Sequence, residues 1–147
     1  MHTWFYGAVQ YDRIAEEGKV ENIVENYLID ALSFTEAESR LIEEIRPFVS
    51  GELTVKKIRR AKINELFYND GSDKWYKAKV MFITLDESKG VEKKTAVTML
   101  VQADGVKDAC EKLTAGMQGT MADYELAGMV ETDILDIFKY EVPETSE

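Results

Sequence analysis

The chain has 147 residues, which suits one domain of ordinary size. Its apolar fraction of 45% and its two prolines indicate a folded globular protein rather than a disordered one. The formal net charge of -10 repels phosphate on average. The composition therefore argues against a protein that coats DNA or membranes through its overall charge, although a local basic patch would override that mean field.

Histidine and cysteine are scarce, and this limits the chemistry that we expect. His2 and Cys110 are the only residues of their kinds, so a zinc site has almost no ligands and no internal disulfide can form. A lone cysteine fits a reducing cytoplasm. The start of the chain lacks the basic and apolar regions of a signal peptide, and no apolar run reaches the ~20 residues that span a bilayer. We therefore predict a cytoplasmic protein with no cofactor, no metal and no membrane partner.

The first half of the chain predicts two strands, a helix and a strand, in that order. Residues 4–13 alternate and are rich in aromatic side chains, and a polar turn with glycine at 15–19 leads to a second strand at 20–31. A last strand is predicted at 53–68, and the link at 69–74 is a short turn.

The helix between these strands has a marked start. Ser33 followed by Glu36 three residues later is a capping box. Pro47 marks the end of the helix. The apolar stripe along one side consists of Phe34, Ala37, Leu41, Ile45 and Phe48.

The second half repeats this order of elements. "WFYGAVQY" at 4–11 matches "WYKAKVMF" at 75–82 at an offset of 71, and the two helices match at an offset of 72. The counterpart of the second strand is predicted at 91–103. The second apolar stripe consists of Val106, Ala109, Leu113 and Met117.

We therefore predict an α+β fold made by internal duplication of a β-β-α-β unit. The first repeat covers about residues 4–68 and the second about 75–140, within a single domain at 1–141, followed by a flexible tail at 142–147. Two such halves would bury their sheets by packing about a pseudo-twofold, with two helices on one face of antiparallel sheet. The sequence leaves open whether the strands form one continuous sheet or two.

The last strand of the second repeat has an alternative interpretation. The residues that also fit the spacing of a helix are Leu126, Met129, Val130, Asp133, Ile134 and Ile137. We favour a strand with a bulge, because the matching stretch of the first repeat is rich in β-branched and aromatic residues at its ends.

Several stretches together resemble one family of small proteins. These are "WFYGAVQY" at 4–11, "ALSFTEAE" at 31–38, "WYKAKVMFITLDE" at 75–87 and "GMQGTMADYELAGM" at 116–129, of which "ALSFTEAE" is the most specific. The chain is similar to a family known only as a domain of unknown function, encoded by Bacteroidota, their phages and mobile elements. The resemblance covers nearly the whole chain. It implies an accessory role in a phage or mobile element and supplies no catalytic residues.

The most unusual feature is the basic stretch "VKKIRRAKI" at 55–63. Its five cations are Lys56, Lys57, Arg59, Arg60 and Lys62. The matching stretch of the second repeat, at 126–134, is neutral to acidic, so the fold does not require this charge. Strand alternation puts Lys57 and Arg59 on one face and the other three cations, Lys56, Arg60 and Lys62, on the other. A bulge near Lys56 is needed to turn Val55 and Ile58 inward together. The alternative is structural, since lysines on an edge strand block aggregation or pair with acids of a neighbouring strand.

These patterns favour a non-catalytic protein that binds an anion, either a nucleotide signal or a single-stranded nucleic acid, through the basic strand. Tyr76 and Lys77 are added to the five cations as candidate ligand-binding residues, and Trp4 and Trp75 are either stacking surface or core. The alternative is a protein-interaction module that forms a homo-oligomer or meets a host protein, with no small ligand. A third hypothesis, an enzyme that uses carboxylates and a divalent metal, has no coherent motif behind it.

Overall fold

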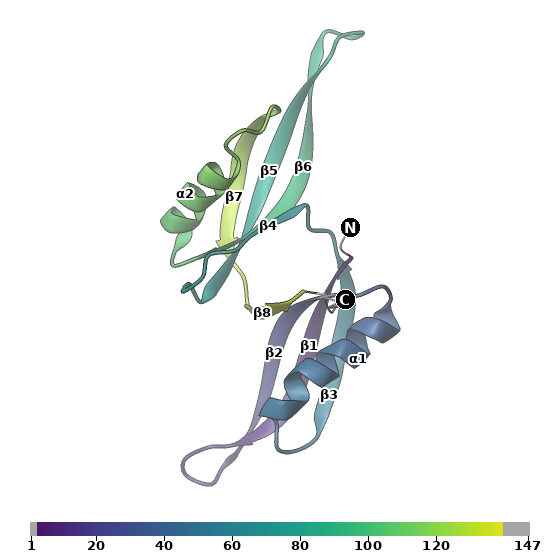
Figure 1. The fold of residues 1–147 in the computed structure, drawn as a ribbon, viewed down its shortest axis with the longest axis vertical. Helices are drawn as coiled ribbons and strands as arrows, with labels where there is room; N and C mark the ends of the chain where they lie inside the picture. Colours follow the sequence, from purple (N-terminus) through teal and green to yellow (C-terminus); the bar gives the residue numbers. More distant parts are fainter. Residues whose placement is uncertain (1–2, 140–147) are drawn as a thin grey trace, which may run out of the picture. The chain divides into compact units, whose positions relative to one another are not determined.

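The computed structural model describes residues 3–139, and the predicted tail at 142–147 lies outside this range. The chain divides into two compact units (Figure 1). Unit 1 holds residues 1–62 and 134–147, and unit 2 holds residues 63–133. In chain order the elements are β1 (Trp4–Ile14), β2 (Val20–Asp30), α1 (Phe34–Ile45), η1 (Arg46–Phe48), β3 (Leu53–Ala61), β4 (Glu65–Phe67), β5 (Lys74–Asp86), β6 (Val91–Ala103), α2 (Val106–Gly116), β7 (Asp123–Glu131) and β8 (Ile134–Phe138).

Within residues 3–139, each unit contains one four-stranded sheet and one α-helix, which confirms the α+β class. The sheet of unit 1 has the order β3-β1-β2-β8, and that of unit 2 has the order β4-β6-β5-β7. In both, a long antiparallel hairpin forms the centre, β1 with β2 and β5 with β6. Over the described residues the strands therefore form two sheets rather than one.

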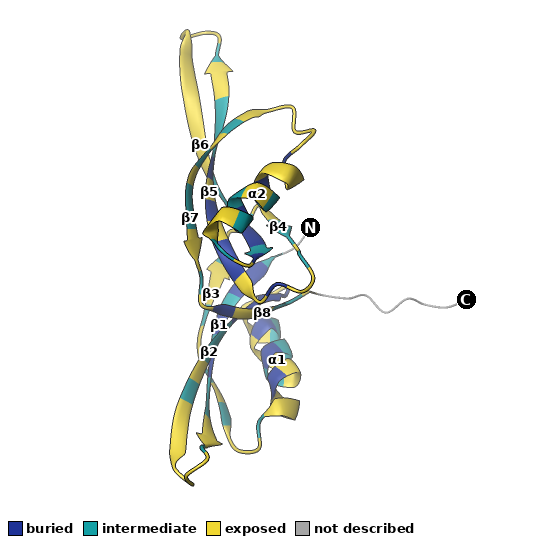
Figure 2. Cartoon of the chain, turned by 90° about the vertical axis from the view of Figure 1, so that its left-hand side faces the viewer, coloured by how far each residue is buried: buried dark blue, intermediate teal, exposed yellow. Residues whose placement is uncertain are grey.

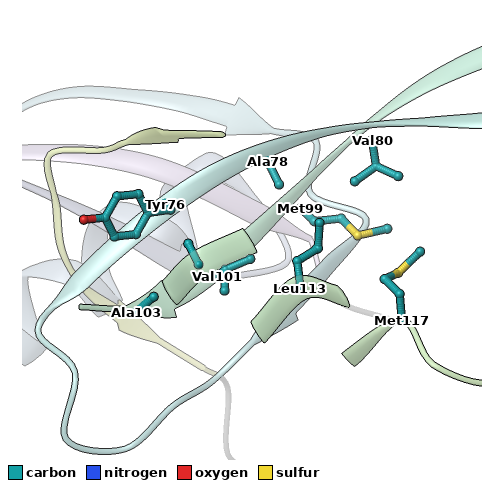
Figure 3. Packing of buried hydrophobic residues seen from close by; sticks show 9 residues of the cluster. Tyr76, Ala78, Val80, Met99, Val101, Ala103, Leu113 and Met117 are labelled. Atoms are coloured by element: carbon teal, nitrogen blue, oxygen red, sulfur yellow. The ribbon is translucent and has the colours of Figure 1, made fainter. Parts of the chain in front are cut away.

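The helices cover their sheets with the residues that the apolar stripes predict. Ala37, Leu41 and Ile45 of α1 are buried in a cluster with residues of β1 and β2 such as Phe5 and Ile29. In unit 2, Leu113 of α2 is buried in a second apolar cluster with strand residues such as Met99 and Val101. Figure 3 shows these residues together with Met117, which follows α2. Burial of these apolar surfaces is the main force that holds each helix to its sheet.

The helix ends differ in part from the prediction. Ser33 caps α1, because its side-chain oxygen accepts a hydrogen bond from the backbone N–H of Glu36 at 3.1 Å. Phe34 and Phe48 were predicted in the buried stripe, but they are exposed, as is Val106 at the start of α2. The stripe fails at the helix ends because Phe34 and Val106 are first helical residues, and because Phe48 lies beyond α1, in the short η1 that contains Pro47.

The predicted single strands at 53–68 and 123–140 are wrong. Each breaks after its first nine residues, and the short strand that follows joins the other unit's sheet, where β4 runs parallel to β6 and β8 runs parallel to β2. The reason is the direction of the strands. β3 already runs in the same direction as β2, and a parallel connection within one sheet needs a dozen or more residues. The linker at 62–64 is too short for that return to the outer side of β2, which β8 occupies, and β4 lies beside β6 of the other sheet instead.

The region 123–138 forms strands and not a helix, so the preferred interpretation is confirmed. β7 pairs antiparallel with β5, and the register shifts so that Ala127 has no partner. The extra residue explains the ambiguity, because a bulge turns Leu126 and Met129, three residues apart, to the same side of the sheet. Alternation without the bulge would separate them.

Candidate anion-binding surface

The basic stretch forms β3, which lies at the edge of the sheet of unit 1. Its only strand neighbour among the described residues is β1, and the register between them shifts at Lys56, which has no partner. The predicted bulge near Lys56 is therefore confirmed. It turns Val55 and Ile58, two half-buried residues, toward the apolar cluster beneath α1.

The register also gives the face on which each cation lies. Lys57 is opposite Ala8 and Arg59 is opposite Tyr6, whereas Arg60 is opposite Phe5, which packs in the cluster that faces α1. Because directly opposed residues of antiparallel strands share a face, Lys57 and Arg59 lie on the face away from α1. Arg60 lies on the helix side. The sequence predicted this division.

All five cations of β3 and the residue after it are exposed (Figure 2 colours the chain by burial), and Arg59 and Arg60 contact aromatic rings. The guanidinium carbon of Arg59 lies 4.5 Å from the ring centre of Tyr6, and that of Arg60 lies 5.9 Å from the ring centre of Phe5. Within residues 3–139 no carboxylate forms an ion pair with any of the five. Pairing with acids of the neighbouring strand therefore does not account for the charge.

A groove of about 200 Å³ runs beside the bulge, between α1 and β3. Phe34, Thr35 and Glu38 of α1 form one wall, and residues 55–58 of β3 form the other. Phe34 is 51% exposed and contacts Phe5 edge-on, with ring centres 5.0 Å apart. Sequence reasoning missed this groove. The apolar spacing places Phe34 in the stripe of α1, but Phe34 is the first residue of the helix. That position at the end of the stripe is the signal that its side chain projects outward.

The other candidate residues named from the sequence belong mainly to unit 2. Tyr76 is 2% exposed and packs in the core of unit 2 with Ala78 and Val101 (Figure 3), so its predicted role as stacking surface is not available. Trp4 and Trp75 are 5% and 3% exposed, in keeping with core positions rather than a stacking surface. Lys77 is exposed on β5, in a different unit from the basic stretch.

Unit 1 holds a second polar feature that sequence reasoning missed. Glu25 accepts hydrogen bonds from the hydroxyls of Tyr11 and Tyr27, the latter at 2.6 Å. Burial and the Glu25 carboxylate raise the pKa of Tyr27 far above its usual value, and the hydrogen bond to Glu25 raises that of Tyr11. The matching positions of unit 2 are Phe82, Val97 and Met99, which is the signal that could have identified this cluster.

Other site types find little support in the described part of the chain. Residues 3–139 contain no group of three or more His, Cys, Asp or Glu side chains placed to hold a metal ion. Cys110 is a free, half-buried thiol on α2. No helix among these residues is both long and apolar enough to cross a membrane.

Comparison with protein families gives a match over most of the chain. A family model described as a domain of unknown function (DUF4494) covers residues 3–140, which is nearly the whole chain. No curated protein and no solved structure matches the chain.

Proposed function

The chain belongs to the family described as a domain of unknown function (DUF4494), and for this member we propose a non-catalytic protein that binds an anionic ligand at the β3 surface. One observation carries the proposal. β3 and the residue after it hold five exposed cations that pair with no carboxylate in residues 3–139, whereas the matching edge strand β7 holds no cation. Exposed, unpaired positive charge attracts a multiply charged anion even on a protein whose mean charge is negative.

The ligand classes that share this chemistry are a nucleotide signal, a single-stranded nucleic acid and an acidic stretch of protein. Arginine fits all three, because its planar guanidinium binds phosphate or carboxylate through two parallel hydrogen bonds. The proposal also includes an accessory role in a phage or mobile element of Bacteroidota and a cytoplasmic location. The first is supported by the resemblance of the sequence, and the second by the single free cysteine.

Native mass spectrometry of the protein purified gently from its own host tests the proposal directly. We expect an added mass that matches a bound anion and that disappears in high salt. The matched variants are Lys57→Ser/Arg59→Ser on β3 and Lys79→Ser/Lys93→Ser on the sheet of unit 2, which remove the same charge. Loss of the added mass only in the first supports the proposal. An added mass that survives in the β3 variant contradicts it.

A second candidate function is self-association, and the charges of the two outer strands favour it. β3 is basic, whereas β7 of unit 2 carries Asp123, Glu125 and Glu131. Opposite charges on two free edges suit head-to-tail contact between copies. Two of these acids already pair within unit 2, Glu125 with Lys94 at 3.0 Å and Glu131 with Lys74 at 3.5 Å. Sedimentation at several protein concentrations tests this candidate, which predicts a mass that rises with concentration and falls with salt.

We also infer that the two units arose by duplication of one ancestral unit. Three features support this: the sheets have matching strand orders, the helices follow the same strands, and the bulges at Lys56 and Ala127 stand 71 residues apart, the offset of the sequence repeat. A pseudo-twofold between the units, with both helices on one face, stays a prediction of that duplication.

A further inference from the structure

The free edge of β3 lies next to both the groove and the cations. Its outer side has no strand neighbour among residues 3–139, so its backbone N–H and C=O groups on that side are open to another chain. An extended segment that adds there would place its side chains alternately on the two faces of the sheet. One set would point toward α1 and the groove, and the other would point toward Lys57 and Arg59.

The groove discriminates between the anionic ligand classes. Its volume of about 200 Å³ is below the ~300–1,000 Å³ that enclose small-molecule ligands, so it suits a side chain better than a whole nucleotide. Single-stranded nucleic acids also need exposed aromatic rings for stacking. Near β3, Arg59 covers the ring of Tyr6, and Phe34 in the groove wall, 51% exposed, offers one stacking position rather than a row of them.

Charge then gives the pattern of the incoming segment. Its residues on the face away from α1 would meet Lys57 and Arg59, where carboxylates are favoured. On the groove side, Phe34, Val55 and Ile58 favour an apolar side chain, and Glu38 on the α1 wall partly offsets the charge of the lysines at 56 and 57 that line the same groove. The bulge at Lys56 interrupts the edge, so regular pairing extends only along Lys57–Ala61.

We propose that β3 and the groove beside α1 bind a short extended segment of a partner protein, with alternating acidic and apolar residues, as an added strand of the sheet of unit 1. This inference rests on the proposed function, because the same cations attract the ligand in both. It goes further by making the ligand a peptide and by requiring backbone pairing and an apolar anchor.

The test uses a short capped and fluorescently labelled peptide that alternates valine and glutamate, with binding followed by anisotropy on the full chain. Three further probes accompany it: the same peptide with lysine in place of glutamate, the glutamate peptide N-methylated at alternate amides, and oligodeoxythymidylate. N-methylation removes hydrogen bonds to a sheet edge and keeps the charge. We expect the glutamate peptide to bind, the lysine peptide not to bind, and N-methylation to weaken binding about tenfold or more.

Two pairs of variants locate the contacts. Lys57→Ser/Arg59→Ser should weaken binding of the glutamate peptide at least about fivefold. The control Lys79→Ser/Lys93→Ser, which removes the same charge, should leave this binding unchanged. Phe34→Ala should weaken it several-fold. Val106→Ala is the matched control, because Val106 is the first residue of α2 and is also 51% exposed. Circular dichroism confirms that each variant is folded.

The outcomes separate this inference from the proposed function. Equal binding of the plain and N-methylated peptides, or no effect of Phe34→Ala, would overturn strand addition and leave charge-based anion binding in place. Binding of oligodeoxythymidylate alone, lost in Lys57→Ser/Arg59→Ser, would overturn the peptide ligand and uphold the proposed function. If neither the glutamate peptide nor the oligonucleotide binds, the peptide inference fails, and the proposed function fails with it only if native mass spectrometry also finds no added mass.

Discussion

Unit 1 and unit 2 have matching strand orders and a bulge at matching positions of the outer strand, yet those two strands carry opposite charges. β3 and the following residue hold five cations, and β7 holds three carboxylates and no cation. The helix-facing sides differ as well, because the Tyr11–Glu25–Tyr27 cluster of unit 1 corresponds to three apolar residues in unit 2. What only one unit possesses is not required by the architecture. The comparison therefore directs attention to unit 1 for function.

The largest effect is expected when a core leucine of either unit is shortened to alanine, and comparing the two losses shows how alike the two cores are. Leu41 and Leu113 are fully buried at matching positions, so either change to alanine should cost about 2–5 kcal/mol of unfolding free energy. We expect the greater cost for Leu41→Ala, because Leu41 fills the space beside Gly7, where unit 2 has Ala78. Urea denaturation measures both.

A double-mutant cycle refines this prediction. A Cβ atom at Gly7 would lie 2.5 Å from Leu41 Cδ2, so Gly7→Ala alone should destabilise the protein. In the Leu41→Ala background the same change should cost less or restore stability, since the obstructing atoms are gone. Additive costs would contradict the contact between these two residues.

The next effect concerns the polar cluster that only unit 1 possesses. Tyr27→Phe removes a buried hydroxyl that donates to Glu25 and should cost about 1.5–3 kcal/mol. Tyr124→Phe, a half-buried tyrosine in unit 2, is the matched control and should change stability by less than about 0.5 kcal/mol. Equal costs would show that the cluster contributes no more than ordinary packing.

The same cluster predicts a dependence on pH. The folded-state pKa values of Tyr11 and Tyr27 lie above the unfolded value of ~10, so their stabilising contribution is complete below pH ~10 and is lost as the pH rises above it. Unfolding free energy measured from neutral to alkaline pH should fall less steeply in Tyr11→Phe/Tyr27→Phe than in the unaltered protein. Parallel curves would contradict the raised pKa values.

A smaller effect separates the two helix starts. α1 begins at Ser33, whose side chain caps the helix, whereas α2 begins at Gly105, which has no side chain to do so. Ser33→Ala should cost about 1 kcal/mol. Gly105→Ser should gain a few tenths of a kcal/mol, because the backbone there is extended and a Cβ atom meets nothing within 4 Å. Thermal unfolding of both variants checks the two signs.

The smallest expected effect lies in the basic strand itself. Lys57→Ser/Arg59→Ser should alter stability by less than about 0.5 kcal/mol per residue, since both side chains are exposed and neither has a carboxylate partner in residues 3–139. Urea denaturation of this variant is also the control for its binding experiments. A large loss would assign the cations to the fold and weaken the case for a ligand.

The sequence by itself determined the local elements, because their causes are local. Alternation set the long hairpins, the helical stripe set the inner sides of α1 and α2, and Ser33 set where α1 begins. Even the bulge in β3 was predictable, since Val55 and Ile58 cannot both turn inward along a regular strand. The division of the cations between two faces followed from the same register.

Only the tertiary structure decided which sheet each last short strand joins and what lies beside β3. The exchange of β4 and β8 depends on the directions of strands distant in the sequence, which linkers of three residues (62–64) and two residues (132–133) cannot reverse. The groove arises where α1 crosses the edge strand, and so Phe34 became a wall of it rather than part of the core. The Glu25 cluster likewise joins two strands through side chains. Such features depend on distances across the fold, which spacing along the chain does not encode.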